Sequence, residues 1–101
     1  MIIGIDLDGT ICTQKAHGSY EQAVLKDGLL EKLRIAIKQG HTVIIYTARH
    51  YLEDILLGQK QLVQWGVPYT FLWPVKPACD IYIDDKNAGV EALDKLVGPV
   101  P

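Results

Sequence analysis

The sequence is poor in the residues that mark several common protein classes. Its 101 residues include two cysteines, Cys12 and Cys79, with no Cys-x-x-Cys pair and no cluster of cysteine and histidine. Two cysteines are too few for the disulfide framework of a small secreted protein, and the lack of a cluster argues against a structural zinc site. We therefore expect both cysteines to be small buried hydrophobic residues.

Long hydrophobic runs and a strong excess of charge are also absent. No apolar run approaches the roughly 18 residues needed to cross a bilayer, and the N-terminus lacks the basic start and apolar stretch of an export signal. A cytoplasmic location is the resulting expectation. The net charge of -2 argues against sequence-independent binding to nucleic acid, which depends on a basic face. A hydrophobic content of 49% predicts one domain with a single core over residues 1–101.

The stretch from Ile2 to Ile11 carries the strongest pattern in the chain. Four mostly apolar residues lead directly into Asp6 and Asp8, and Gly9 then allows a tight turn. An uncharged run of this kind is typical of a strand buried on both faces of a parallel sheet, and ligands bind beyond the carboxyl ends of such strands. The alternative is a β-hairpin that turns at Asp8 and Gly9. An EF-hand calcium loop is excluded, because its glycine and final glutamate belong at other positions.

Further along the chain, extended apolar runs alternate with helical patterns. Apolar residues recur every three or four positions from Asp27 or Gly28 to a closing Gly40, and again over residues 52–65, where Gly58 is a weak point and Gly66 the stop. Extended runs occupy residues 41–47, 69–73 and 80–83, and we expect the run at 69–73 to be the one nearer the sheet edge. A last helical pattern begins at Asn87, with an inward face of Val90, Leu93, Leu96 and Val97.

This alternation predicts the fold class. Strand, helix, strand units form right-handed crossovers, so the strands should be parallel. We expect an α/β protein with a three-layer, Rossmann-like, doubly wound parallel sheet.

Polar side chains follow the ends of the expected strands. They are Asp6 and Asp8, then Thr47, then Lys76 in a loop, and finally Asp84 and Asp85. The carboxyl ends of parallel strands share one edge of a sheet, and four carboxylates crowded there would cost several kcal/mol unless a cation lay among them. Oxygen ligands of this kind suit Mg²⁺. The sequence therefore predicts a magnesium site at this edge.

The same residues resemble a known family. The run Asp6-Leu7-Asp8-Gly9-Thr10, the strand ending in Thr47, the later Lys76 and the strand ending in Asp84-Asp85 resemble, in order, the four motifs of the haloacid dehalogenase superfamily of phosphohydrolases. The first motif is the specific one, and the others gain meaning from their order. The resemblance implies a Rossmann-like sheet with the first strand at its centre, a magnesium ion and an aspartyl-phosphate intermediate.

The resemblance also implies roles for the four carboxylates. Asp6 would be the nucleophile that attacks phosphorus, and it would also bind the metal. Asp8 would protonate the leaving oxygen and then activate water, with its backbone carbonyl on the metal. Asp84 would be a direct metal ligand, and Asp85 would bind directly, bind through water or orient the site.

The remaining candidates would bind the substrate. Thr47 and Lys76 would hold the transferring phosphoryl group. Arg49 could form a fork with a second anionic group of the substrate, or it could form a surface salt bridge. His50 and Lys86 are further candidates for substrate contacts.

The segments between the motifs are too short for a cap domain. About twenty residues separate Thr47 from the next strand, and a helix uses most of them, while residues 11–28 have room only for a small flap. We expect an open site, covered by a large substrate or by a neighbouring subunit of a homo-oligomer.

A further likeness, in residues 18–23, 40–41 and 47–49, is to small capless proteins of capsule and surface-polysaccharide biosynthesis. It implies a sugar phosphate as substrate. The alternatives are a nucleic-acid-end or nucleotide phosphatase and a non-catalytic phosphate-binding module.

Overall fold

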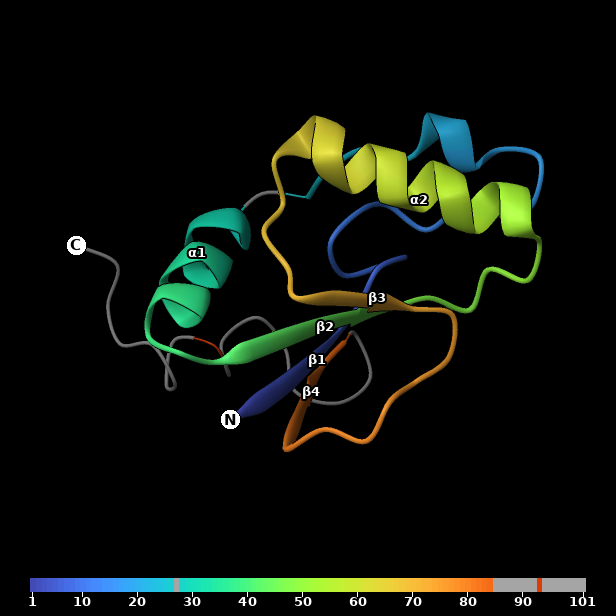
Figure 1. The fold of residues 1–101 in the computed structure, drawn as a ribbon. Helices are drawn as coiled ribbons and strands as arrows, with labels where there is room; N and C mark the ends of the chain where they lie inside the picture. Colours follow the sequence, from blue (N-terminus) through green and yellow to red (C-terminus); the bar gives the residue numbers. More distant parts are fainter. Residues whose placement is uncertain (27, 85–92, 94–101) are drawn as a thin grey trace.

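The structure, a computed structural model, describes residues 1–26, 28–84 and 93. Its centre is a four-stranded parallel sheet in the order β3-β2-β1-β4 (Figure 1). The strands are β1 (Ile2–Asp6), β2 (Thr42–Tyr46), β3 (Phe71–Trp73) and β4 (Ile81–Ile83). This confirms the predicted Rossmann-like α/β class, with the first strand inside the sheet and the third at an edge. Strand β3 begins two residues later than the sequence pattern suggested, at Phe71.

The interior of β1 is uncharged because the strand is buried on both faces. Ile3 and Ile5 have no exposed surface, and they belong to the same core as Val43 and Ile45 of β2. Gly4 lies against Cys79, since a Cβ atom at position 4 would be 2.8 Å from the Cys79 sulfur. A side chain at this position would therefore collide with the neighbouring chain segment.

The hairpin alternative is wrong. Both neighbours of β1 are parallel strands that come much later in the chain, with Ile2 opposite Thr42 and Ile3 opposite Ile81. The chain after Asp8 forms a compact turn, in which the Gly9 N–H donates to the Cys12 carbonyl at 2.8 Å. Gly9 adopts a φ of +91°, a conformation open to glycine at little cost.

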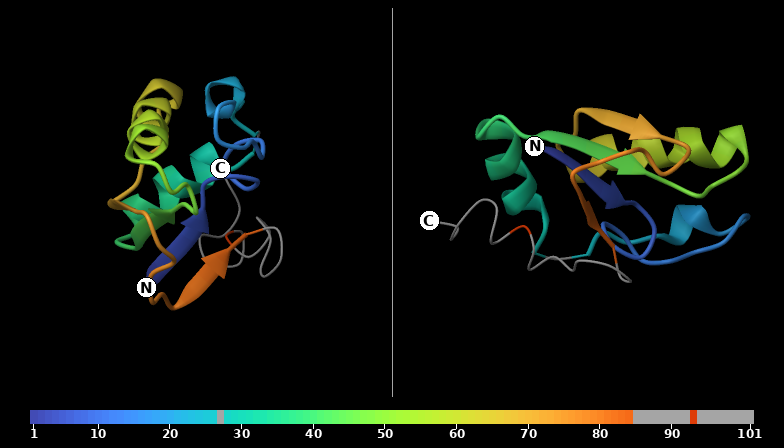
Figure 2. Two further views of the ribbon diagram at one scale, coloured as in Figure 1. Left: turned by 90° about the vertical axis from the view of Figure 1, so that its right-hand side faces the viewer. Right: turned by 90° about the horizontal axis from the view of Figure 1, so that it is seen from below.

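Two helices cover one face of the sheet. They are α1 (Leu30–Lys38) and α2 (Leu52–Trp65), and both lie on the same side of the strands (Figures 1 and 2). Successive right-handed crossovers from β1 to β2 and from β2 to β3 run in one direction across the sheet, which puts both helices on one face. Leu33 of α1 and Leu62 of α2 are the large side chains that these helices bury most fully.

The bounds of α2 match the sequence prediction, whereas α1 is shorter than predicted. Gly66 ends α2 in the left-handed conformation with a φ of +69°. Helix α1 begins at Leu30, after Leu29 as its N-cap, rather than at Asp27 or Gly28, and it ends at Lys38 before a Gln39 C-cap. No side chain caps the N-terminus of α1 or of α2, so neither start is marked by a capping contact. Residue 27 lies outside the described residues.

The segment of residues 13–26, here called the flap, follows the turn after β1. It contains one turn of 3₁₀ helix, η1 (Tyr20–Gln22), which lies beside α2 (Figure 2). Two polar contacts join the flap to that helix. His17 Nδ1 contacts Asp54 Oδ2 at 2.7 Å, and Gln61 Nε2 donates to the Tyr20 carbonyl at 2.8 Å.

Several predictions concern residues that the structure does not describe. The last helical pattern from Asn87, with Val90, Leu96 and Val97, and the candidates Asp85 and Lys86 all lie outside the described residues. Leu93 is described, and it is fully buried in the core as predicted. Over the described part of the chain the fold has no cap domain, and no helix there is long and apolar enough to cross a membrane.

Candidate functional site

The predicted site residues that the structure describes meet at one edge of the sheet. Asp6 is the last residue of β1, Thr47 follows β2, and Asp84 follows β4. The strand register brings them together, because Asp6 is opposite Tyr46 and Ile5 is opposite Ile83. Parallel strands place successive ends on the same edge, so the convergence follows from the topology.

A pocket of about 400 Å³ opens at this edge. Asp6, Thr47 and Lys76 all line it, so the predicted nucleophile and both predicted phosphoryl-binding residues face one space. The other lining residues are Tyr46, Ala48, His50, Pro74 and Val75. The last two come from the loop after β3, which therefore forms one wall of the pocket.

Asp8 lies at the centre of a buried polar network rather than in the lining of this pocket. Its two carboxylate oxygens accept from Arg49, at 2.9 Å from Nη2 to Oδ1 and 3.2 Å from Nε to Oδ2. Thr47 Oγ1 donates to Asp8 Oδ2 at 3.1 Å and accepts the backbone N–H of Arg49 at 3.2 Å. Thr47 thus connects the pocket to Asp8.

Cys12 adds a weak contact to this network. Its sulfur lies 3.7 Å from Asp8 Oδ1 and has no exposed surface. Burial, followed by the charge of Asp8, raises the pKa of the Cys12 thiol to about 12, so the thiol stays protonated and can donate. Burial was correctly predicted for Cys12, whereas Cys79 is only partly buried.

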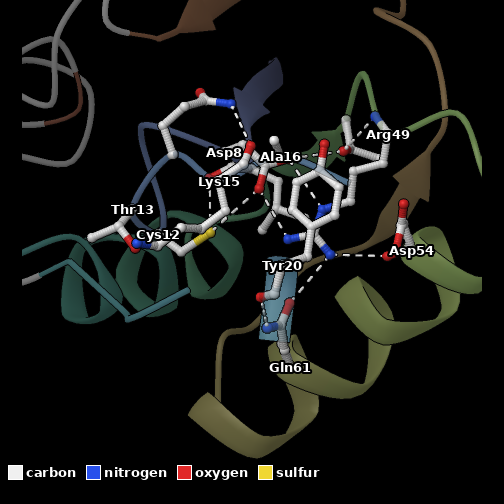
Figure 3. Close-up of polar contacts among 12 residues, drawn as sticks. Asp8, Cys12, Thr13, Lys15, Ala16, Tyr20, Arg49, Asp54 and Gln61 are labelled. Atoms are coloured by element: carbon white, nitrogen blue, oxygen red, sulfur yellow. Dashed lines mark hydrogen bonds and ion pairs between the residues drawn. The ribbon is translucent and has the colours of Figure 1, made fainter. Parts of the chain in front are cut away.

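Arg49 forms a buried ion pair, not a surface one (Figure 3). Its side chain has no exposed surface, and it is not among the residues that line the pocket. To bind a second anionic group of the substrate, its guanidinium would have to leave Asp8. That role stays a prediction, and the contacts present here are those of a side chain that orients Asp8.

Asp84 belongs to a second polar cluster, with Tyr46 and Lys76. The Tyr46 hydroxyl donates to Asp84 Oδ2 at 3.1 Å, and Lys76 Nζ lies 3.9 Å from the same oxygen. The ammonium also lies over the Tyr82 ring, 4.5 Å from its centroid. Burial and then the Asp84 contact raise the pKa of Tyr46, so its hydroxyl remains a donor.

The oxygen donors at this edge fit a magnesium ion, although no three histidine, cysteine or acidic side chains in the described part of the chain are grouped as a complete metal site. Magnesium commonly takes one or two protein carboxylates and completes its shell with water and phosphate oxygens. Asp6 ends β1 and Asp84 follows β4, the parallel strand beside it, so the two can supply two such carboxylates. The described residues can therefore supply part of the ligand shell of a magnesium ion, with water and phosphate oxygens as the other ligands.

Among the residues with roles in these clusters, Tyr46, Tyr20 and Gln61 were not singled out in the sequence. Tyr46 could have been noticed, because it is the last residue of an expected strand and directly precedes Thr47. Nothing local marks the other two, since their contacts with Arg49 join segments 29 and 12 residues apart in the chain.

No known protein-family profile matches this chain, and no curated protein matches its sequence. Its structure is similar to a chain in a solved structure of a Pnkp1/Rnl/Hen1 complex, with a TM-score of 0.61 and 19% sequence identity. The similarity covers 83% of this chain and 28% of the other, so this chain corresponds to a minor part of the larger one. At this level of identity the likeness shows a shared fold.

Proposed function

We propose that this chain is a magnesium-dependent phosphomonoesterase of the haloacid dehalogenase type, which acts through a phosphoryl group held covalently on Asp6. One observation supports the proposal above all. Asp6, Thr47 and Lys76 line a single pocket, and the hydroxyl that borders this pocket also contacts Asp8. The proposal includes a single domain over residues 1–101 and a cytoplasmic location, both predicted from the sequence.

In the first half-reaction, a carboxylate oxygen of Asp6 attacks the phosphorus atom of the monoester. The bond from phosphorus to the leaving oxygen breaks, and Asp8, protonated at this stage, transfers its proton to that oxygen. Thr47 donates its hydroxyl to the phosphoryl group, and the Lys76 ammonium offsets its negative charge. The acyl phosphate so formed is far easier to hydrolyse than the original ester.

In the second half-reaction, Asp8 acts as a base. Its carboxylate accepts a proton from water, and the water oxygen attacks phosphorus. The bond from phosphorus to Asp6 breaks, which restores the Asp6 carboxylate and releases inorganic phosphate. The net change is ester plus water to alcohol plus phosphate. The carboxylate of Asp8 paired with Arg49 is the form that this half-reaction needs.

The residues proposed to hold magnesium are Asp6, Asp84 and the backbone carbonyl of Asp8, with Asp85 as a further ligand outside the described residues. When bound, the ion would neutralise charge on the carboxylates and the phosphoryl oxygens. The ammonium of Lys76, 3.9 Å from Asp84, supports the same charge balance from the protein side.

The sugar phosphate that the sequence likeness implies is compatible with the size of the pocket. A volume of about 400 Å³ exceeds what a phosphoryl group alone needs, so part of the leaving group can enter. We propose a sugar phosphate, with a second subunit or the substrate itself covering the site. A nucleotide or a nucleic-acid end is the second candidate. Arg49, His50 and Lys86 remain proposed as substrate contacts, in the case of Arg49 only after its release from Asp8.

The experiment that tests the proposal measures phosphate release by the purified full chain from p-nitrophenyl phosphate, a sugar phosphate panel, nucleotides and a phosphorylated oligonucleotide. Asp6→Asn should lower kcat at least about a thousandfold, because it removes the covalent step. Glu53→Gln is the matched control, since Glu53 is an exposed carboxylate in the first turn of α2. Chelation of magnesium should abolish turnover, and added magnesium should restore it.

The outcome separates the competing functions. Turnover that survives in Asp6→Asn would remove Asp6 from the mechanism. A wild-type chain that binds inorganic phosphate but releases none from any substrate would identify a non-catalytic binding module. Selective turnover of the oligonucleotide would favour the second substrate candidate over a sugar phosphate.

A further inference from the structure

The Arg49 guanidinium has one edge toward Asp8 and the other toward helix α2 (Figure 3). On the α2 side, Nη1 donates to the Asp54 carbonyl at 2.9 Å and to Gln61 Oε1 at 3.2 Å. Together with the two contacts to Asp8, four donations come from a group that has five N–H bonds. The side chain is therefore fixed from both edges.

The Tyr20 ring contacts the flat face of the Arg49 guanidinium. The centroid of the Tyr20 ring lies 4.1 Å from Arg49 Cζ, within the range of a cation–π contact. The Tyr20 carbonyl accepts the amide of Gln61, whose oxygen in turn accepts from Arg49. Gln61 is 5% exposed, and it ties together the flap, helix α2 and Arg49.

Helix α2 also leaves the space that this arrangement needs. A Cβ atom at Gly58 would lie 3.0 Å from Arg49 Nη1 and 3.2 Å from a Leu7 methyl group. Glycine in the middle of a helix is unfavourable by itself, but here it leaves room for the Arg49 guanidinium, which a side chain at this position would contact.

We propose that Gln61 and Tyr20 are positioning residues that set the orientation of the Asp8 carboxylate through Arg49. The inference rests on the proposed function, in which Asp8 transfers protons. A fork with two parallel N–H···O contacts fixes the plane of a carboxylate as well as its charge. Loosening that fork should impair protonation of the leaving oxygen more than the attack by Asp6 on phosphorus.

The test compares two substrates with different needs for a general acid. An aryl phosphate releases a phenolate that needs little protonation, whereas an alkyl phosphate releases an alkoxide that must be protonated as it leaves. We expect Gln61→Met and Tyr20→Leu to lower kcat/KM for glycerol 2-phosphate by at least about tenfold, which is part of the roughly 10²–10⁴-fold effect of a general acid, and for p-nitrophenyl phosphate by less than about threefold. The ratio kcat/KM reports the first half-reaction, so it isolates the acid step.

Two comparisons separate positioning from a general loss of structure. Tyr20→Phe keeps the ring and the backbone carbonyl, and it should rescue the ratio lost in Tyr20→Leu. Gln64→Met makes the same chemical change as Gln61→Met at an exposed position of α2, and it should leave both rates unchanged. Partial unfolding would instead lower both rates by one factor.

A second readout does not depend on activity. The chain has two arginines, Arg34 and Arg49, so the Nε–H region of its NMR spectrum should contain two signals. Arg34 is half exposed, and its signal should exchange quickly with water. The Arg49 signal should be protected in the wild type and should exchange faster in Gln61→Met.

Each outcome bears on a different claim. If the wild type is active and Gln61→Met and Tyr20→Leu leave the ratio of the two rates unchanged, the positioning inference is overturned and the proposed function stands. If the wild type turns over neither substrate, the proposed function fails and the inference fails with it.

Discussion

Replacing Gly58 with alanine has two opposing effects on stability: it improves helix propensity, and it adds a methyl group to a packed interior. Gly58 lies in the interior of α2, where alanine is more favourable than glycine by about 1 kcal/mol. The added methyl group would lie 3.0 Å from Arg49 Nη1 and 3.2 Å from Leu7 Cδ2. Forcing an extra methyl group into a packed interior costs about 1–3 kcal/mol. We therefore expect Gly58→Ala to lower the free energy of unfolding by about 0–2 kcal/mol, the difference between these two terms.

Urea denaturation measures this free energy, and an internal reference isolates the packing part. Gln59 is the next residue of α2 and is exposed. The difference between Gln59→Gly and Gln59→Ala therefore gives the glycine-to-alanine gain in this helix without the contact to Arg49. The shortfall of Gly58→Ala relative to that gain is the packing cost.

The activity of Gly58→Ala provides a second, independent expectation. Because Nη1 must move to accept the methyl group, the fork on Asp8 should tilt, and kcat/KM should fall more for glycerol 2-phosphate than for p-nitrophenyl phosphate. If Gly58→Ala instead gains the full propensity term and keeps the ratio of the two rates, then Arg49 does not occupy the position described and the reasoning is refuted.

Other substitutions give sharp expectations elsewhere in the molecule. The hydrogen bond to Asp54 raises the pKa of His17 above 6.5. The stability that His17→Gln loses should therefore be fully present below pH 6.5 and should disappear as the pH rises through the raised pKa, which urea denaturation at several pH values can measure. Gly4→Ala should destabilise the fold by about 1–3 kcal/mol in urea, because its Cβ would meet the Cys79 sulfur at 2.8 Å, and Cys79→Ala should relieve much of this loss. Tyr46→Phe removes the donor to Asp84, and calorimetry without substrate should show magnesium affinity reduced by about 10–100-fold; an unchanged affinity would place the metal away from Asp84.

The sheet and the edge where the candidate residues meet could be predicted because the relevant signals are local. The uncharged runs before Asp6 and Thr47 indicate buried strands, and the handedness of crossovers then fixes which strand ends meet. The bounds of the elements were less accurate where local signals were weak. Helix α1 begins at Leu30 rather than at Asp27 or Gly28, and strand β3, at an edge of the sheet, pairs over only three residues, from Phe71.

The position of the Arg49 side chain could not be predicted from the residues next to it in the sequence. Its position two residues after Thr47 suggests the pocket, where an anion would be expected. The side chain is buried against Asp8 instead because α2 has no side chain at Gly58, and because Gln61 offers an acceptor one turn further along. Both conditions depend on how α2 packs over the sheet, so the sequence marked Gly58 only as a weak point in a helix.

The Thr47 hydroxyl couples the two halves of the site. It has one proton, which it donates to Asp8 Oδ2 in this structure, and a phosphoryl group in the pocket would compete for that proton. Under the proposed function, when the hydroxyl turns to the phosphoryl group, Asp8 loses one of its donors, while both contacts from Arg49 remain and keep the plane of its carboxyl group. Departure of phosphate would return the Thr47 donor to Asp8. On this reasoning, the Arg49 fork fixes the orientation of Asp8, and the Thr47 hydroxyl is the contact that changes when a phosphoryl group binds.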